Sequence, residues 1–194
     1  MVLDIVVYGD PILRTKGRPV TEVTDNLRTL AANMIETMEL ARGVGLAAPQ
    51  IGQPIQLAVI DVSHDPDCVS HFQVDGQDAN LTDWMPLIFI NPQIEGSPER
   101  EADTEGCLSF PELRADVRRP QSVRATLTLL DGPTVTIETD GLLARALQHE
   151  TDHLNGILFI DRLPSAKKLA LKRKIRQMQD EYGLRYTPEA ETVE

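Results

Sequence analysis

The sequence predicts an α+β domain in which mostly antiparallel sheets pack around a central helix, with further helices near the N-terminal and C-terminal ends. Two features of the 194 residues predict this class. Helical periodicity lies on both sides of a group of short strand patterns, and the regular strand–helix alternation of a parallel sheet is absent. We expect a single domain over residues 1–186 and a disordered tail over residues 187–194.

The first helix is expected from Asp25 to Ala41, with Thr24 or Asp25 as its N-cap. Its apolar residues are three and four positions apart, which is typical of one buried helix face. They are Leu27, Leu30, Ala31, Met34, Ile35 and Met38. Gly43 and Gly45 follow and open an irregular glycine-rich loop.

Strands are expected from the apolar runs that come next. The runs before the central helix are Ile55–Val62, Leu87–Ile90, Val123–Leu130 and Thr134–Glu138. Asn91-Pro92 is expected to close the second run, and residues 131–133 (Asp-Gly-Pro) to form a hairpin turn between the last two. Residues 64–83 are rich in Asp, so we expect a long polar surface loop there.

Two more helices complete the expected fold. The central helix should run from about Gly141 to Asn155 and stop at Gly156, which suits the left-handed position after a helix. A short strand is expected at Ile157–Ile160, and the last helix should begin at Pro164 and continue to about Tyr182.

The composition is that of a soluble globular protein, with 41% hydrophobic and 25% charged residues. A formal net charge of −11 argues against specific binding to DNA. Between Arg162 and Gln179, however, there are seven basic residues and no acidic ones. This stretch is either a solvated helix face or a docking surface for an RNA-rich or acidic partner.

The predicted location is the cytoplasm. Residues 1–7 are too short and too acidic for a signal peptide, and no apolar run approaches the length of a membrane span, so no membrane partner is expected. The two cysteines, Cys68 and Cys107, are too few for a disulfide framework. Reduced thiols are the better interpretation, and Cys107 is then free to bind a metal.

A metal site is predicted by the segment from Gln148 to His153. Residues four apart on a helix share one face, so His149 and His153 are close enough to hold one ion. Glu150 lies beside them and can handle protons. The spacing favours metal-assisted hydrolysis, although two histidines also occur at this spacing by chance.

The third ligand is expected upstream of the helix. Phe159 stands where one extended metalloprotease pattern has its third His, and downstream acids such as Asp161 are poorly placed. Cys107, between Gly106 and an apolar residue, completes a set that leaves one position for water. The alternative for Cys107 is a small buried hydrophobe.

Two further patterns are weaker. His64, Cys68 and His71 have ligand-like spacing, but the polar loop around them offers nothing to fix their geometry. The run from Gly43 to Gln50 either forms a structural turn or aims the Gln50 amide at a substrate oxygen.

Three segments in this order resemble the signature motifs of the peptide deformylases: Gly43–Gln50, Glu105–Ser109 and Gln148–Gly156. Asp10–Arg14 also looks like the N-terminal segment of that family, so the resemblance extends over about residues 6–163. Residues 64–83 look longer than the corresponding loop of typical members. The C-terminal extension is similar to that of the bacterial branch with a helical end.

The resemblance implies a hydrolase that removes the formyl group from the N-terminal formyl-methionine of newly made polypeptides. It implies one divalent metal per chain, held by Cys107, His149 and His153, with attack of a metal-bound hydroxide on the formyl carbon. Fe(II) is the physiological metal that the family suggests, and Zn, Ni or Co can replace it in a purified sample.

The resemblance also implies the catalytic groups and the peptide site. The Gln50 side-chain amide and the Leu108 backbone N–H would hold the oxyanion, while Glu150 would move the proton. The residues expected to contact the peptide are Val44, Gly45, Glu105, Arg114, Leu142, Arg145 and Ala146. The first two would present backbone groups to an extended chain, and the apolar pair on the central helix would form the slot for methionine.

Two other functions stay open from the sequence. An endoproteolytic metallopeptidase shares the helix motif, and a non-catalytic metal-binding or ribosome-associated module would close the coordination sphere with a fourth protein ligand. If the chain is a deformylase, its basic last helix is expected to dock near the ribosomal exit.

Overall fold

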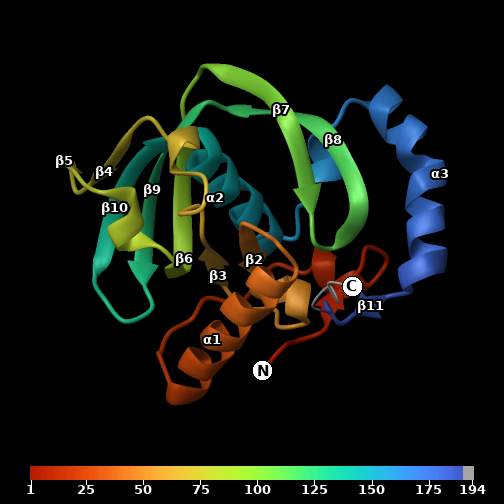
Figure 1. Cartoon of the computed structure of the whole chain (residues 1–194), viewed down its shortest axis with the longest axis horizontal. Coiled ribbons are helices and arrows are strands. Elements are labelled where there is room, and N and C mark those ends of the chain that lie inside the picture. The colour runs from red at the N-terminus through yellow and green to blue at the C-terminus, as the bar shows by residue number, and fades with distance from the viewer. Residues whose placement is uncertain (190–194) are drawn as a thin grey trace, which may run out of the picture.

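A computed structural model of the chain describes residues 1–189. Figure 1 shows helix α2 (Gly141–Leu154) at the centre, with strands on both of its sides and helices α1 (Asp25–Leu40) and α3 (Ser165–Tyr182) outside them. Every pair of named strands in the described residues is antiparallel. The predicted α+β class with mostly antiparallel sheets is therefore confirmed.

The larger sheet has seven strands and covers one side of α2. In spatial order the strands are β2 (Gly45–Ala47), β3 (Leu57–Ile60), β6 (Leu87–Gly96), β9 (Ser122–Leu129), β10 (Thr134–Asp140), β4 (Phe72–Val74) and β5 (Gln77–Asp78). Strand β2 lies at one edge of this sheet, which leaves its outer side without a strand partner.

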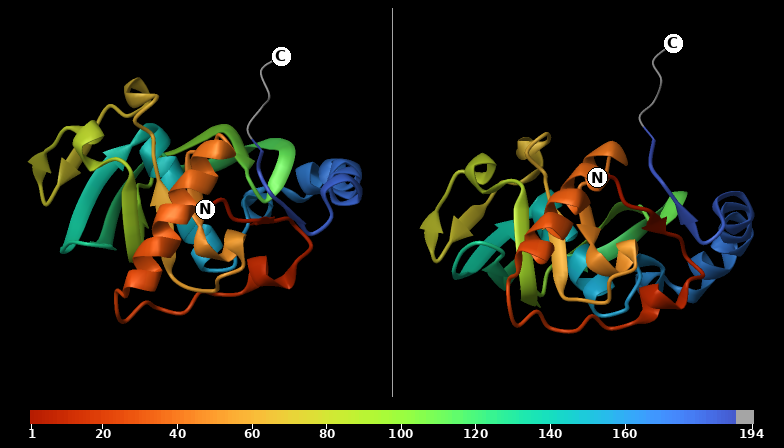
Figure 2. Two further views of the ribbon diagram at one scale, coloured as in Figure 1. Left: turned by 60° about the horizontal axis from the view of Figure 1, so that its bottom comes forward. Right: turned by 90° about the horizontal axis from the view of Figure 1, so that it is seen from below.

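Two smaller sheets flank the other side of α2. The long hairpin of β7 (Arg100–Cys107) and β8 (Phe110–Pro120) arches over the helix (Figure 1). Strands β1 (Ile5–Val6) and β11 (Arg185–Tyr186) pair the two ends of the chain next to this hairpin. Helix α3 lies at the edge of the molecule in both views of Figure 2.

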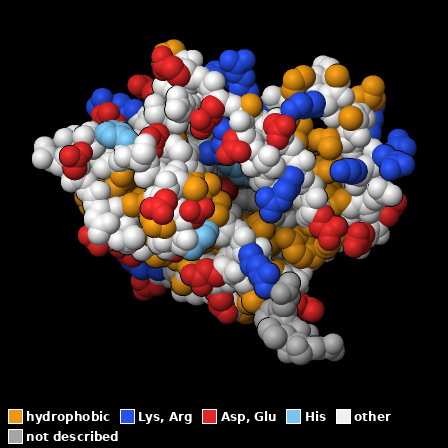
Figure 3. All heavy atoms as spheres, turned by 45° about the horizontal axis from the view of Figure 1, so that its top comes forward, with side chains coloured by type: hydrophobic (Ala, Val, Ile, Leu, Met, Phe, Trp, Pro, Cys, Tyr) orange, Lys and Arg blue, Asp and Glu red, His pale blue; other side chains and the backbone are white. Residues whose placement is uncertain are grey.

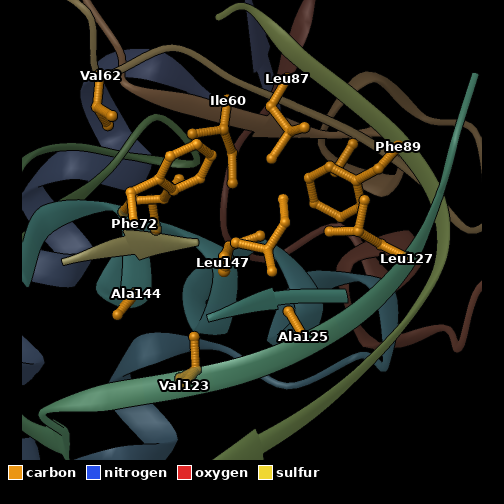
Figure 4. Packing of buried hydrophobic residues seen from close by; sticks show 14 of the residues in the cluster. Ile60, Val62, Phe72, Leu87, Phe89, Val123, Ala125, Leu127, Ala144 and Leu147 are labelled. Carbon is orange, nitrogen blue, oxygen red and sulfur yellow. The ribbon is translucent and has the colours of Figure 1, made fainter. Parts of the chain in front are cut away.

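The main core lies between α2 and the seven-stranded sheet. Figure 4 shows Ala144 and Leu147 of α2 facing sheet residues such as Phe89 and Leu127, and all four are fully or almost fully buried. Burial of one such large side chain contributes about 1.5–3 kcal/mol, so this face fixes how α2 sits on the sheet. The opposite face of α2 carries polar residues, which belong to the candidate functional site.

The ends of the helices agree with the predictions. The Thr24 hydroxyl accepts a hydrogen bond from the Leu27 N–H and caps α1. Gly156 follows α2 with a φ of 72°, the left-handed conformation that ends a helix. Neither cysteine forms a disulfide.

The expected long loop at residues 64–83 is wrong in part. The chain forms the hairpin β4–β5 there, and Phe72 and Val74 are buried against the core. The turn consists of Asp75 and Gly76, both with positive φ, and this pair is a known hairpin signal. The apolar alternation of β4 consists of Phe72 and Val74 alone, and the many acidic residues around it favoured the prediction of a loop.

Two other boundaries need correction. Strand β6 does not close at Asn91-Pro92 but passes through a bulge there and continues to Gly96. Asn91 takes a φ of 51°, and its side chain bonds to the backbone N–H and C=O of Val20. The expected strand at 157–160 is replaced by a 3-10 helix at Phe159–Arg162, because Phe159 and Ile160 turn into the core.

Strands β7 and β8 were not predicted. Most of β7 is exposed and carries charged side chains, so it lacks an apolar alternation. In β8, Glu112 has a φ of 59° and moves Phe110 out of phase with the buried Leu113 and Val117. Of the expected tail, residues 187–189 belong to no helix or strand, and residues 190–194 lie outside the described part.

Candidate metal centre

Three potential metal ligands converge on one point. Cys107 ends β7, and His149 and His153 lie one turn apart on α2. The Cys107 Sγ is 3.2 Å from the His153 Nε2, which is 3.2 Å from the His149 Nε2. The three ligand atoms lie within 4.8 Å of one another, and residues 1–189 contain no other such group of three. The pattern at His64, Cys68 and His71 therefore forms no site.

The donor set fits a divalent metal of the iron or zinc type. One thiolate and two imidazole nitrogens face each other from fixed elements, which is the arrangement of a three-ligand site with an open position. Both histidines are buried. Burial, the largest cause, holds the pKa of His153 well below its ordinary value and favours the neutral ring.

Glu105 orients one of these ligands. Its Oε2 lies 3.1 Å from the His149 Nδ1, which leaves the Nε2 of the same ring to face the metal position. Although burial favours the neutral acid, the hydrogen bonds from His149 and Arg119 hold the pKa of Glu105 well below its ordinary value. Arg145 adds a bond of 2.7 Å to the same carboxylate.

Arg119 links the two elements that carry the ligands. Its guanidinium donates to Glu105 of β7 at 2.5 and 2.9 Å, and to Asp152 of α2 at 2.8 Å. Arg162 pairs with the outer side of Asp152. The side chains of Glu105, Arg119 and Asp152 are all more than 90% buried, so this chain of charges is shielded from water and from salt.

Glu150 points into the same region without a hydrogen-bond partner for its Oε2 among the described residues. Burial raises the pKa of Glu150 to about 7, which suits a group that takes up and releases protons near neutral pH. Gly45 provides the space for it, because a Cβ at that position would run into the Glu150 carboxylate.

Gln50 and Leu108 lie beside the ligands. The Ala47 N–H donates to the Gln50 Oε1 at 2.8 Å, which turns the Gln50 Nε2 toward the Cys107 Sγ at 3.6 Å and the Ser109 Oγ at 3.3 Å. Leu108 lies in the tight turn between β7 and β8, directly after the cysteine.

The site opens into a pocket with a volume of about 540 Å³. Figure 3 shows it as a hollow in this face of the molecule. All the site residues expected from the sequence line it except His153, which lies beneath. Those in the lining are Val44, Gly45, Gln50, Glu105, Cys107, Leu108, Arg114, Leu142, Arg145, Ala146, His149 and Glu150.

Sequence reasoning missed several residues of this site. Arg119 is one, since a buried arginine in a strand of charged residues gives no local signal. Tyr182, at the end of α3, and Tyr186, in β11, are others, because both come from the C-terminal end of the chain and reach the pocket only through the tertiary fold. Burial raises the pKa of Tyr186 to about 12, so its hydroxyl stays protonated.

A Cys-His-His cluster with one open side, a buried glutamate and an adjoining pocket define the class of site found in metal-dependent hydrolases. Comparisons with known proteins agree. A family model described as polypeptide deformylase matches residues 2–169. The peptide deformylase of Opitutus terrae is 43% identical over 92% of this chain and 93% of its own, and that of Methylacidiphilum infernorum is 44% identical over 92% and 94%.

Solved structures give the same result. A peptide deformylase from Legionella pneumophila superposes with a TM-score of 0.78 and 35% identity, over 93% of this chain and 97% of its own. One from Ehrlichia chaffeensis, in complex with actinonin, gives 0.79 and 32%, over 94% and 98%. The chain therefore belongs to the peptide deformylase family, a family of metal-dependent enzymes. Within residues 1–189, none of the helices has the length and apolar content needed to cross a membrane.

Proposed function

We propose that this enzyme hydrolyses the formyl group from the N-terminal formyl-methionine of newly made polypeptides in the cytoplasm. One observation carries the proposal: Cys107, His149, Glu150 and Gln50 line one pocket, and the three potential ligand atoms of Cys107, His149 and His153 lie within 4.8 Å of one another beside it. A closed structural metal site would have a fourth protein ligand in place of this pocket.

The chain's own residues have separate tasks in this reaction. A divalent metal held by Cys107, His149 and His153 would polarise the formyl oxygen and lower the pKa of a bound water. Fe(II) is the metal we propose in the cell, with Zn, Ni or Co able to replace it in vitro. Glu150 takes the proton from the attacking water and passes it to the leaving amine, a role that its pKa of about 7 supports.

As the formyl carbon is attacked, negative charge develops on the formyl oxygen, and this oxyanion needs hydrogen-bond donors that are already in position. The Gln50 Nε2 is one, because its other amide atom is fixed by the Ala47 N–H. The Leu108 backbone N–H is the second. Losing one donor of this kind costs about 2.7–4 kcal/mol in the barrier.

The peptide is expected to bind along the edge strand β2. Val44 and Gly45 lie at the start of this strand beside the pocket, so an extended substrate can add to the sheet through backbone hydrogen bonds. Leu142 and Ala146 on α2 form an apolar wall next to them and can receive the methionine side chain.

The charged lining residues have two different roles. Glu105 and Arg145 bind each other and Glu105 binds His149, so we assign them to holding the site at the rim of the methionine slot. Arg114 is exposed on β8, pairs in register with Gly106 and lines the pocket, so we assign it to the outer end of the peptide site.

Helix α3 is the proposed docking element for the ribosome. Its basic residues other than the half-buried Lys168 are exposed, and one of them, Lys167, makes an ion pair with Asp116 of β8 at 3.5 Å. Figure 3 shows Lys and Arg side chains gathered on this side of the molecule. Salt-sensitive sedimentation with ribosomes should be lost when the residues after Pro164 are deleted, and sedimentation unaffected by the deletion would remove this role.

The reaction is tested with a formyl-Met-Ala peptide and an N-acetylated peptide as control. We expect formate from the first peptide and no turnover of the second, and no cleavage inside casein. Glu150→Gln should lower the rate of formate release by a factor of about 10²–10⁴, and the variant should keep its bound metal. A fully active Glu150→Gln enzyme would show that another group moves the proton.

A further inference from the structure

We infer that Tyr186, in the C-terminal strand β11, is a positioning residue for the turn that carries both Cys107 and the Leu108 N–H. This inference rests on the proposed function, because that turn supplies a metal ligand and an oxyanion donor. We assign Tyr186 no direct part in the reaction, because its hydroxyl donates to the Leu108 carbonyl oxygen.

The turn is held from both ends of the chain. The Tyr186 hydroxyl donates to the Leu108 carbonyl oxygen at 3.0 Å. The Tyr8 N–H donates to the Ser109 carbonyl oxygen at 2.9 Å. Two successive carbonyl groups directly after the cysteine are therefore fixed, one by the C-terminal segment and one by the N-terminal segment.

The two terminal segments are joined to each other, so they act as one support. Strand β11 pairs with β1 in the register Ile5 with Tyr186, and the Val7 N–H donates to the Leu184 carbonyl at 2.8 Å. The Gln179 side chain of α3 donates to the Tyr8 carbonyl at 2.8 Å. The position of Tyr186 is thus set by a backbone ladder and not by its own side chain alone.

The turn has little room on its other side. A Cβ on Gly43 would come within 2.8 Å of the Leu108 side chain, which shows that Leu108 packs closely against this glycine. Leu108 is thus confined between Gly43 and the Tyr186 hydroxyl. Loss of the hydroxyl removes a constraint on one side only, and the Leu108 N–H can then move relative to Gln50 and the ligands. A donor that must meet a developing charge tolerates little displacement.

The supporting residue lies beyond the part of the chain that the family model matches, which ends at residue 169. The metal ligands, Gln50 and Glu150 all lie inside that part. The structure therefore assigns a role in the active site to a segment outside the matched core.

The pair Tyr186→Phe and Tyr182→Phe tests this role. Both changes remove one hydroxyl from a tyrosine that lines the pocket, and the two rings are neighbours with centroids 5.6 Å apart. Within residues 1–189, the hydrogen bond of the Tyr182 hydroxyl goes to the Glu112 carboxylate, at 3.4 Å, and not to the turn, so this variant is the matched control. Neither change removes buried apolar volume.

Two readouts are needed. With the formyl-Met-Ala peptide, we expect Tyr186→Phe to lower kcat about fivefold, the size of one lost neutral hydrogen bond, with KM changed less than twofold. In ¹⁵N relaxation of the purified proteins, the order parameter of the Leu108 N–H should fall from a rigid value near 0.85 toward about 0.6. Tyr182→Phe should leave the Leu108 order parameter at its wild-type value and should lower kcat less than Tyr186→Phe does.

The outcomes separate this inference from the proposed function. If the wild-type enzyme releases no formate, the function is wrong, and the order parameter alone then decides the positioning role. An unchanged Leu108 order parameter in Tyr186→Phe overturns the inference, whatever the activity. Equal losses of kcat in both variants overturn it as well, because they would trace the loss to the aromatic wall in general.

Discussion

Glu105→Gln is the substitution that most directly tests how the metal ligands are held. The Glu105 carboxylate is 4% exposed and accepts hydrogen bonds from Arg119 and Arg145, besides its contact with His149. The substitution keeps the shape of the side chain but removes its charge. The largely buried guanidinium groups of Arg119 and Arg145 then each lose an anionic partner. Removing one partner of a buried ion pair costs about 3–5 kcal/mol, and we expect the lower end because Asp152 still binds Arg119.

The assay is urea unfolding followed by circular dichroism on protein stripped of metal with a chelator, so that metal binding does not enter the free energy of unfolding. Glu101→Gln is the matched control, because Glu101 is 45% exposed and lies 3.9 Å from Arg145. We expect the control to stay within about 0.5 kcal/mol of the wild type. If Glu105→Gln also stays within that range, Glu105 does not hold the site as argued.

The same variant has a predicted pH dependence. The pKa of Glu105 is lowered in the folded protein, so the stabilisation from its charge is fully present above the pKa of the unfolded chain, about 4.3. It is lost as the pH falls below that value. The stability difference between wild type and Glu105→Gln should therefore shrink on acidification, and a difference that grows in acid would contradict the assigned charge. At neutral pH, the metal affinity of Glu105→Gln should be about 10–100-fold lower than that of the wild type.

Three further changes have defined outcomes. Gln50→Ala should lower kcat by about 10²–10³ through loss of an oxyanion donor, with much less effect on KM, and an unchanged kcat would remove Gln50 from this role. Gly45→Ala should lower both kcat and Tm, because the added Cβ meets the Glu150 carboxylate; a variant that melts like the wild type would show that the contact relaxes. Asp140 accepts hydrogen bonds from the Ser70 hydroxyl and from the Ser70 and His71 backbone N–H groups, which outweigh its partial burial and lower its pKa, so its stabilisation is present above the ordinary carboxylate pKa and lost in acid. The Tm of Asp140→Asn should therefore lie below that of the wild type near neutral pH, and the two curves should converge in acid.

The helices and the clustering of Cys107, His149 and His153 could be predicted from the sequence. The apolar spacing in α1 and the cap at Thr24 act within one turn or two. His149 and His153 are placed together by helix geometry alone, whatever the rest of the fold does. Cys107 could be chosen because the downstream positions offered no suitable third ligand.

The remaining features depend on contacts between distant segments. Glu105 is the one buried residue of β7 because it pairs with Arg119 across the hairpin and with Arg145 of α2, and no pattern within the strand indicates these partners. The β4–β5 hairpin at residues 72–78 rests on two buried residues and an Asp75-Gly76 turn. Tyr186 reaches the site from the far end of the chain by pairing with β1.

The buried charges explain how a ligand from a hairpin and two from a helix reach one point. Glu105 precedes Cys107 by two residues in β7, and Asp152 precedes His153 on α2. Arg119 of β8 binds both carboxylates, so one guanidinium fixes the hairpin against the helix right beside the ligands. A buried ion pair adds little net stability over an apolar contact of the same volume. An apolar contact, however, tolerates sliding, whereas paired hydrogen bonds of 2.5–2.9 Å set both distance and direction. The benefit of these charges is therefore the fixed separation between the sulfur and the imidazoles. A joint replacement of Glu105, Arg119, Asp152 and the buried Arg145 by apolar residues leaves none of these four charges unpaired, and it should preserve stability while weakening metal binding.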